Sequence, residues 1–167
     1  MKRRLTILTL TTLAAVALIG VVWTAPSPAF AGGATQISGD ARFDEAPFCA
    51  TVMGYEYALD MTGDLEGCLY TDVKTAESSP SGTYRETGTE LFVGSYLDKG
   101  SGTFETTYRF EAKYEDVANL LGEQFGRCQH PIVEGSGTGI FEGVSGQLFF
   151  KDEVESGTFF YRGHLRY

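Results

Sequence analysis

Few side chains in this sequence are of the types that acid–base chemistry needs, and they lie far apart along the chain. One carboxylic acid, two phenols, one guanidinium and one imidazole stand out within segments of alternating apolar and polar residues: Glu90, Tyr108, Tyr161, Arg127 and His130. They form no obvious acid–base or nucleophile set. A ring-closing reaction can still proceed on a shaped pocket and a few polar groups. Each residue also fits a structural role, and His130, which precedes a proline, can simply end a strand.

The three cysteines indicate a disulfide rather than a metal centre. In an oxidising compartment we expect two of Cys49, Cys68 and Cys128 to pair. Cys49–Cys68 is the first expectation, because both belong to the same candidate hairpin region, and a bridge from Cys128 to either is the alternative. No Cys-x-x-Cys is present, and His130 and His164 have no partners at ligand spacing. We therefore expect neither a metal nor another cofactor.

The N-terminal segment has the three parts of a secretory signal peptide. Basic residues at 2–4 precede an apolar stretch over 5–22, and Ala29-Phe30-Ala31 is the small-x-small pattern that signal peptidase accepts. This pattern predicts a signal peptide at 1–31, a single domain over 32–167 and a secreted, extracellular location. An uncleaved membrane anchor is the alternative, because about 18 apolar residues can span a bilayer.

The charge of the chain restricts its partners. Cleavage would remove three of the 13 basic residues and none of the 22 acidic ones, and so lower the net charge from −9 to −12. Such a surface repels nucleic acid and anionic membranes, and no cluster of Lys and Arg interrupts it. We expect no nucleic-acid partner and, after cleavage, no membrane contact.

From Ala34 onward the apolar residues recur with a period of two, which is typical of β-strands. The clearest strand, 103–113, places Phe104, Tyr108 and Phe110 on one face, and the last segment, 158–167, does the same with Phe159 and Tyr161. Glycine-containing turns lie between many of these segments. Weaker alternation marks 34–43, 51–59, 65–72, 82–87, 89–97, 121–128 and 147–152.

Eight or nine short strands favour an all-β fold, namely a single closed antiparallel barrel of about eight strands. An open sheet of this length would leave two edges unpaired and its aromatic side chains wet, whereas closure removes both problems. A barrel of this size encloses either a packed core or a cavity for one small ligand. A β-sandwich would satisfy the same alternation and is the alternative.

Three segments resemble the allene oxide cyclases and, less closely, the dirigent proteins. The segment 135–147 reads GSGTGIFEGVSGQ and resembles the cyclase signature, while 102–110 and 158–163 are similar to strands of that family. The resemblance covers about 88–165. It implies an eight-stranded barrel, often a trimer, whose apolar lumen holds a lipid-like or aromatic molecule. It places Phe104 in the lumen and puts Leu91 where the cyclases carry a cysteine, so the chain departs from the cyclase pattern there.

These observations predict a secreted barrel that binds or sequesters a small apolar molecule in its lumen. One alternative is a cyclase or isomerase of the allene oxide cyclase-like type, acting on a lipid-like or secondary-metabolite precursor. Another is an extracellular scaffold with a packed core, which a cavity below about 100 Å³ would favour. The residues predicted to line the lumen are Phe104, Tyr108, Phe110, Leu91, Phe159 and Tyr161.

Overall fold

The computed structural model describes residues 33–43, 48–50, 52 and 54–167. The signal peptide predicted at 1–31 therefore lies outside the described residues. Within the described ranges, no helix is long and apolar enough to cross a membrane.

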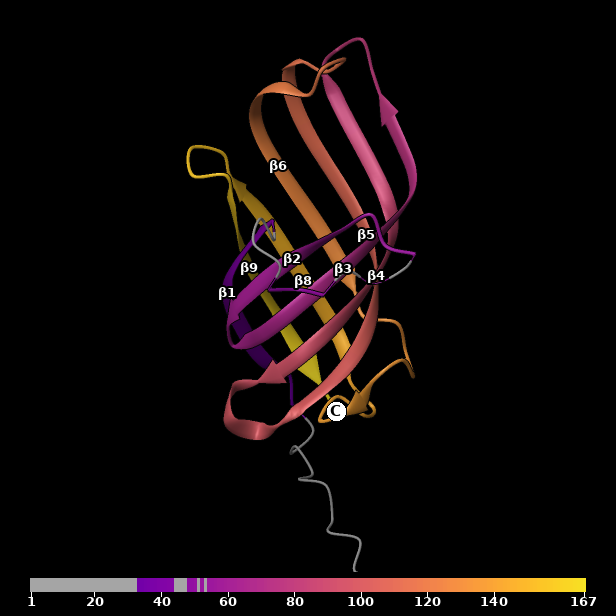
Figure 1. The fold of residues 1–167 in the computed structure, drawn as a ribbon, viewed down its shortest axis with the longest axis vertical. Coiled ribbons are helices and arrows are strands. Elements are labelled where there is room, and N and C mark those ends of the chain that lie inside the picture. Colours follow the sequence, from indigo (N-terminus) through magenta and orange to yellow (C-terminus); the bar gives the residue numbers. More distant parts are fainter. Residues whose placement is uncertain (1–32, 44–47, 51, 53) are drawn as a thin grey trace, which may run out of the picture.

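The described part of the chain is built from nine strands and one short 3-10 helix (Figure 1). Successive strands are joined by turns or loops, and the helix η1 lies between the fourth and fifth strands. The bounds are β1 Thr35–Phe43, β2 Tyr57–Gly63, β3 Leu65–Ser78, β4 Thr83–Tyr96, η1 Leu97–Lys99, β5 Ser101–Asp116, β6 Leu121–Pro131, β7 Thr138–Gly139, β8 Ser145–Glu153 and β9 Thr158–Arg166.

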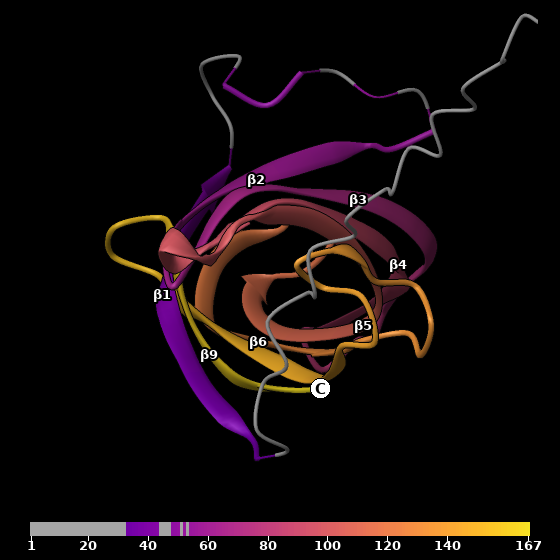
Figure 2. The same cartoon turned by 90° about the horizontal axis from the view of Figure 1, so that it is seen from below.

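Eight of these strands form a closed antiparallel barrel. They pair in the order β1, β2, β3, β4, β5, β6, β8, β9, and β9 pairs back onto β1. Figure 2, a view from below, shows the resulting ring of strands. The two-residue β7 is an extra strand that pairs with the start of β5. The predicted barrel is confirmed, and the β-sandwich is excluded because no barrel strand is left with an unpaired edge.

The alternation of residue types sets which side chains face the lumen. On β5, Phe104 and Tyr108 are buried and Arg109 is exposed. On β9, Tyr161 is buried and Arg162 is exposed. A shift of one residue would exchange the two faces of a strand, so these burials confirm the predicted register.

The strand β4 differs from the sequence prediction, which divided it into 82–87 and 89–97. Gly88 lies between these segments, but it is an interior residue of β4 that opposes Tyr108 of β5. A Cβ atom at Gly88 would lie 2.6 Å from the Tyr108 ring. The glycine therefore makes room for an aromatic ring in the lumen and does not end the strand.

The predicted Cys49–Cys68 disulfide is present, with a Cα–Cα separation of 5.7 Å. Cys68 and Tyr70 alternate along β3 with the lumen-facing Leu69, so the disulfide lies on the outside of the barrel wall, in a small apolar cluster with Tyr70. Among the described residues Cys128 is the free cysteine, and it is buried.

Candidate functional site

One half of the lumen is filled by aromatic rings, and we refer to the region around Phe92, Phe104 and Phe141 as the packed half. Phe92 stacks on Phe104 with ring centroids 4.9 Å apart, and Phe141 meets Phe104 edge-on at 5.0 Å. None of the three side chains is exposed to solvent. Phe141 comes from the glycine-rich segment 135–147, so this segment helps to close one end of the barrel.

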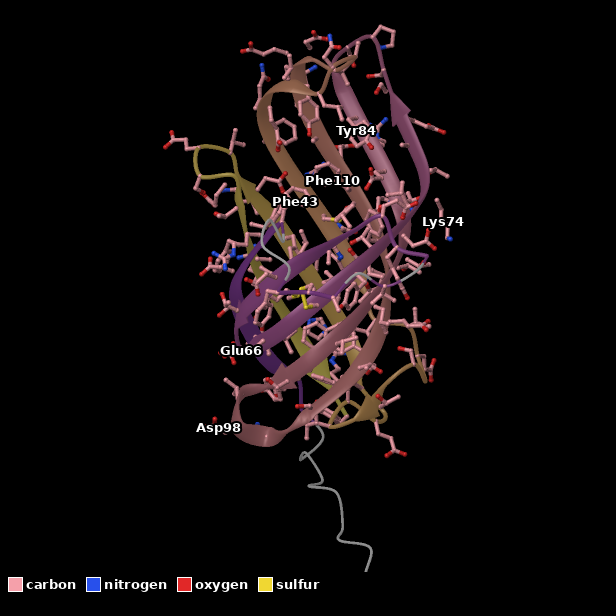
Figure 3. All side chains as sticks on the ribbon, in the orientation of Figure 1. Phe43, Glu66, Lys74, Tyr84, Asp98 and Phe110 are labelled. Atoms are coloured by element: carbon pink, nitrogen blue, oxygen red, sulfur yellow. A yellow bond between two sulfur atoms is a disulfide. The ribbon has the colours of Figure 1, made fainter. Side chains whose placement is uncertain are left out.

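The other half of the lumen, the cavity half, contains a cavity of about 290 Å³. Its opening lies among side chains that stay partly exposed, namely Phe43 (50%), Leu120 (46%) and Val154 (42%). Figure 3 places Phe43, Tyr84 and Phe110 in the upper part of the barrel and Asp98 at its lower end. The apolar wall of the cavity consists of Phe43, Leu59, Phe110, Leu120, Phe150, Val154 and Phe159.

A buried hydrogen-bonded pair, Glu90 with His130, lies where the cavity meets the packed half. Nδ1 of His130 is 2.6 Å from Oε2 of Glu90, and each residue is only 3% exposed. Thr106 donates its hydroxyl to Oε2 of Glu90 at 2.5 Å, and Thr71 donates to Oε1 at 3.4 Å. Since Glu90 accepts these bonds as a carboxylate, Nδ1 of His130 carries the hydrogen of the 2.6 Å contact.

The second nitrogen of His130 is not satisfied in the same way. Nε2 is buried, has no hydrogen-bond partner, and belongs to a side chain that lines the cavity. The ring of Phe150 at 4.4 Å and that of Tyr108 at 6.1 Å hold the imidazole in place. An unsatisfied buried nitrogen is costly, so its place at a cavity wall suggests a bound group that pairs with it.

Toward the opening, Glu86 accepts hydrogen bonds from three tyrosine hydroxyls. Tyr84 donates at 2.5 Å, Tyr108 at 2.6 Å and Tyr57 at 3.5 Å. Burial raises the pKa of all three phenols far above the usual value, and the nearby Glu86 raises each further. The tyrosines therefore remain protonated donors, and Glu86 is held as their common acceptor.

A second acidic group lies nearer the opening. Burial, and next the hydrogen bond with Glu123, raises the pKa of Asp152 to about 8. Tyr114 donates to Oε2 of Glu123 at 3.4 Å. A Cβ atom at Gly126 would collide with the Asp152 carboxyl group, so only glycine admits this acid into the wall.

Neither a nucleophile nor a metal site is evident among the described residues. Cys128 lines the cavity, but burial, and next the charge of Glu90, raises the pKa of its thiol. A thiol held in its protonated form is a poor nucleophile. In the part of the chain that the structure describes, no three His, Cys, Asp or Glu side chains are grouped so that they could hold a metal ion.

The residues predicted to line the lumen occupy three different places. Tyr108, Phe110 and Phe159 line the cavity, whereas Phe104 and Tyr161 are fully buried and do not. The prediction for Leu91 is corrected, because its side chain packs against the disulfide cluster outside the barrel. Its neighbours Glu90 and Phe92 face the lumen, and adjacent residues in a strand point to opposite faces.

The polar candidates separate in the same way. Glu90, Tyr108 and His130 meet in the lumen, whereas Arg127 lies on the outer surface, where it binds Glu111 at 2.9 Å. Tyr161 instead binds the backbone: it accepts from the Leu65 amide at 2.9 Å and donates to the Leu65 carbonyl oxygen at 3.2 Å.

Sequence reasoning missed seven acidic or tyrosine residues of the cavity. A signal for two of them was present in β4, where Tyr84 and Glu86 share the even-numbered face with Glu90 and Phe92. Glu123 and Asp152 gave no such signal, because each lies at the end of a strand near a turn. The missed residues are Tyr57, Tyr84, Glu86, Tyr114, Glu123, Asp152 and Glu153.

Comparison with known proteins did not identify a family for this chain. No protein-family model matches the chain, and no curated protein matches it either.

Proposed function

We propose that this protein is a secreted barrel that binds a small, largely apolar molecule in its cavity half. The observation that carries the proposal is the cavity of about 290 Å³, which opens at one end of a lumen otherwise filled by close-packed rings. The signal-like segment at 1–31 and the Cys49–Cys68 disulfide support secretion. A scaffold with a packed core would describe only the packed half.

The size and lining of the cavity support this type of ligand. Ligand pockets usually enclose roughly 300–1,000 Å³ and combine apolar walls with a few placed polar groups. A volume of about 290 Å³ is at the lower end of that range and suits one compact molecule. The rings of Phe110 and Phe159 supply apolar contact, and Glu86 and His130 supply the polar groups.

Binding can be tested with N-phenyl-1-naphthylamine, a neutral dye whose fluorescence rises in apolar cavities. We expect saturable binding of one dye per chain. Phe110→Ala, which removes a ring from the cavity wall, should weaken binding by about tenfold, the effect of roughly 1.4 kcal/mol. Phe149→Ala is the matched control, because Phe149 is 38% exposed on the outside of β8. The proposal fails if the dye does not bind, or if both variants lose it equally.

A second candidate function, an isomerase or cyclase, is favoured by the geometry of His130. Nδ1 is fixed by Glu90 at 2.6 Å, and Nε2 has no partner at the cavity wall. A carboxylate that orients an imidazole in this way prepares the other nitrogen to take a proton from a bound molecule. The resemblance of 135–147 to the allene oxide cyclases is in line with a ring-closing or isomerising reaction.

A general base in an apolar cavity can be detected with 5-nitrobenzisoxazole. Removal of the hydrogen at C3 of this probe breaks its N–O bond and releases a coloured phenolate. If His130 acts as a base, the protein should accelerate this reaction, and His130→Gln should reduce the rate to that of buffer. His164→Gln is the matched control, since His164 alternates with the lumen-facing residues of β9. Equal rates in wild type and His130→Gln would rule out this second function.

A further inference from the structure

The charges on the two sides of the barrel wall differ sharply. Among the described residues that line the cavity, five are acidic and none is lysine or arginine. The outer surface of β5, β6, β8 and β9 carries the basic side chains Arg109, Arg127, Lys151 and Arg162. The basic side chains of these strands thus lie outside the cavity, while acids from β4, β6 and β8 line it.

The single histidine of the cavity does not balance these acids. His130 is bound through Nδ1 to Glu90, and Asp152 holds a proton beside Glu123, which leaves Glu86 and Glu123 without a cationic partner among the described residues of the cavity. Buried carboxylates without a positive partner are strongly disfavoured. A positively charged ligand would supply the missing partner.

The rings around Glu86 are suited to the same kind of ligand. The hydroxyls of Tyr57, Tyr84 and Tyr108 all point to its carboxylate, and Tyr84 meets the Phe110 ring edge-on at 6.2 Å. Aromatic faces beside a carboxylate attract ammonium groups, because the face of a ring carries negative charge. The attraction increases where water is excluded.

One unpartnered buried atom points independently to an absent ligand. Nε2 of His130 belongs to a side chain that is only 4% exposed and that lines the cavity. In a neutral imidazole whose Nδ1 donates, this nitrogen accepts a hydrogen bond, and ammonium groups that carry hydrogens are donors only.

We propose that the ligand of the cavity half is an organic cation, an ammonium group on an aryl or short alkyl body, held between the tyrosine rings and Glu86. This inference rests on the proposed function, that the cavity binds a small molecule. The apolar body of the ligand would contact Phe110, Phe150 and Phe159, and its charge would face the acids.

Phenyltrimethylammonium and tert-butylbenzene have the same shape and differ by one positive charge. We expect the folded protein at pH 7.5 and low salt to bind the cation at least about tenfold more tightly, in NMR titrations of both probes. Equal or tighter binding of tert-butylbenzene would overturn the inference and leave the proposed binding function intact. If neither probe nor the neutral dye binds, the proposed function fails as well.

Variants that remove one acidic charge show which residues cause the preference for the cation. Glu86→Gln should lower the ratio of the affinity for phenyltrimethylammonium to that for tert-butylbenzene by about tenfold. Glu123→Gln provides a second test if Glu86→Gln does not fold, as judged by circular dichroism. Glu105→Gln removes the same charge from the exposed outer face of β5 and is the matched control. The inference is also overturned if both lumen variants keep the full preference for the cation.

Discussion

The packed half and the cavity half of the lumen are built from the same strands and differ in almost every physical respect. In β4, Phe92 is fully buried against other rings, and six residues away, beyond Glu90, Glu86 faces the cavity. In β5, Phe104 likewise belongs to the packed half, and Tyr108 lines the cavity. The packed half removes apolar surface from water by close contact between rings, while the cavity half holds buried acids and an unpartnered nitrogen. Stability and ligand chemistry are thus separated along the barrel axis.

Buried charge shows the same division. An ion pair in a protein interior rarely repays the cost of removing both groups from water. Glu90 and His130 therefore add little net stability compared with apolar side chains of similar size. Their retention at the cavity wall fits a role in ligand handling better than a role in folding.

The largest expected effect on stability comes from removing a ring from the packed half. Phe104→Ala should lower the free energy of unfolding by about 3–5 kcal/mol, because the ring is fully buried between Phe92 and Phe141. Phe110→Ala, at the cavity wall, should cost clearly less, about 1 kcal/mol, since one side of its ring already lacks neighbours. Urea denaturation monitored by circular dichroism measures both values. Similar losses for the two variants would mean that the halves do not differ in packing.

A smaller effect is expected from breaking the buried pair. Glu90→Leu should cost about 2–3 kcal/mol, because it leaves His130 and two threonine hydroxyls without their acceptor. The double variant Glu90→Leu, His130→Leu should recover part of that loss. The same denaturation experiment provides the comparison. If the double variant is less stable than Glu90→Leu, the pair is a net source of stability and the contrast with the packed half is weakened.

The smallest effect concerns the acids near the opening. The pKa of Asp152 rises from 3.8 to about 8, so the folded protein holds a proton that the unfolded chain releases between these values. This contribution to stability is complete below pH 4 and is lost as the pH rises through about 8. The contribution of Asp152 to the free energy of unfolding should fall between about pH 4 and pH 8, by about 1 kcal/mol because the group is partly solvated.

Two variants isolate this pH dependence. Asp152→Asn should flatten the fall, because asparagine does not titrate, and denaturation curves at a series of pH values would detect it. Asp98→Asn, in the exposed β4–β5 connection, should leave the fall unchanged. An unaltered slope in Asp152→Asn would assign the titration to other groups.

The inward face of a strand could be predicted from the sequence wherever either its even-numbered or its odd-numbered residues are all apolar or aromatic. Phe104, Tyr108 and Phe110 alternate with charged or polar residues, so the inward face of β5 was evident. In β4 the odd-numbered and even-numbered residues of the run Leu91-Phe92-Val93 are all apolar, so the local pattern does not decide which face is inward. Pairing of Phe92 with Phe104 decides it, and this contact between strands left Leu91 outside.

The candidate site could be predicted only in part for a related reason. Glu90 and His130 were recognisable as chemically able residues, but 40 positions separate them, and only barrel closure brings them together. Glu86 was hidden because an acid between polar neighbours resembles any solvent-facing residue. The division of the lumen into two halves depends on side-chain volumes summed over many strands, which no single segment reveals.

The position of Phe141 at the packed end has a kinetic consequence. The rings around Phe141 close the packed end of the lumen, and the cavity opens near Phe43, Leu120 and Val154. A molecule therefore enters and leaves by the same route. An occupant must then depart before its competitor can arrive, and its residence time does not depend on the concentration of that competitor. The acids beside this opening would speed the arrival of positively charged molecules, and added salt would slow it.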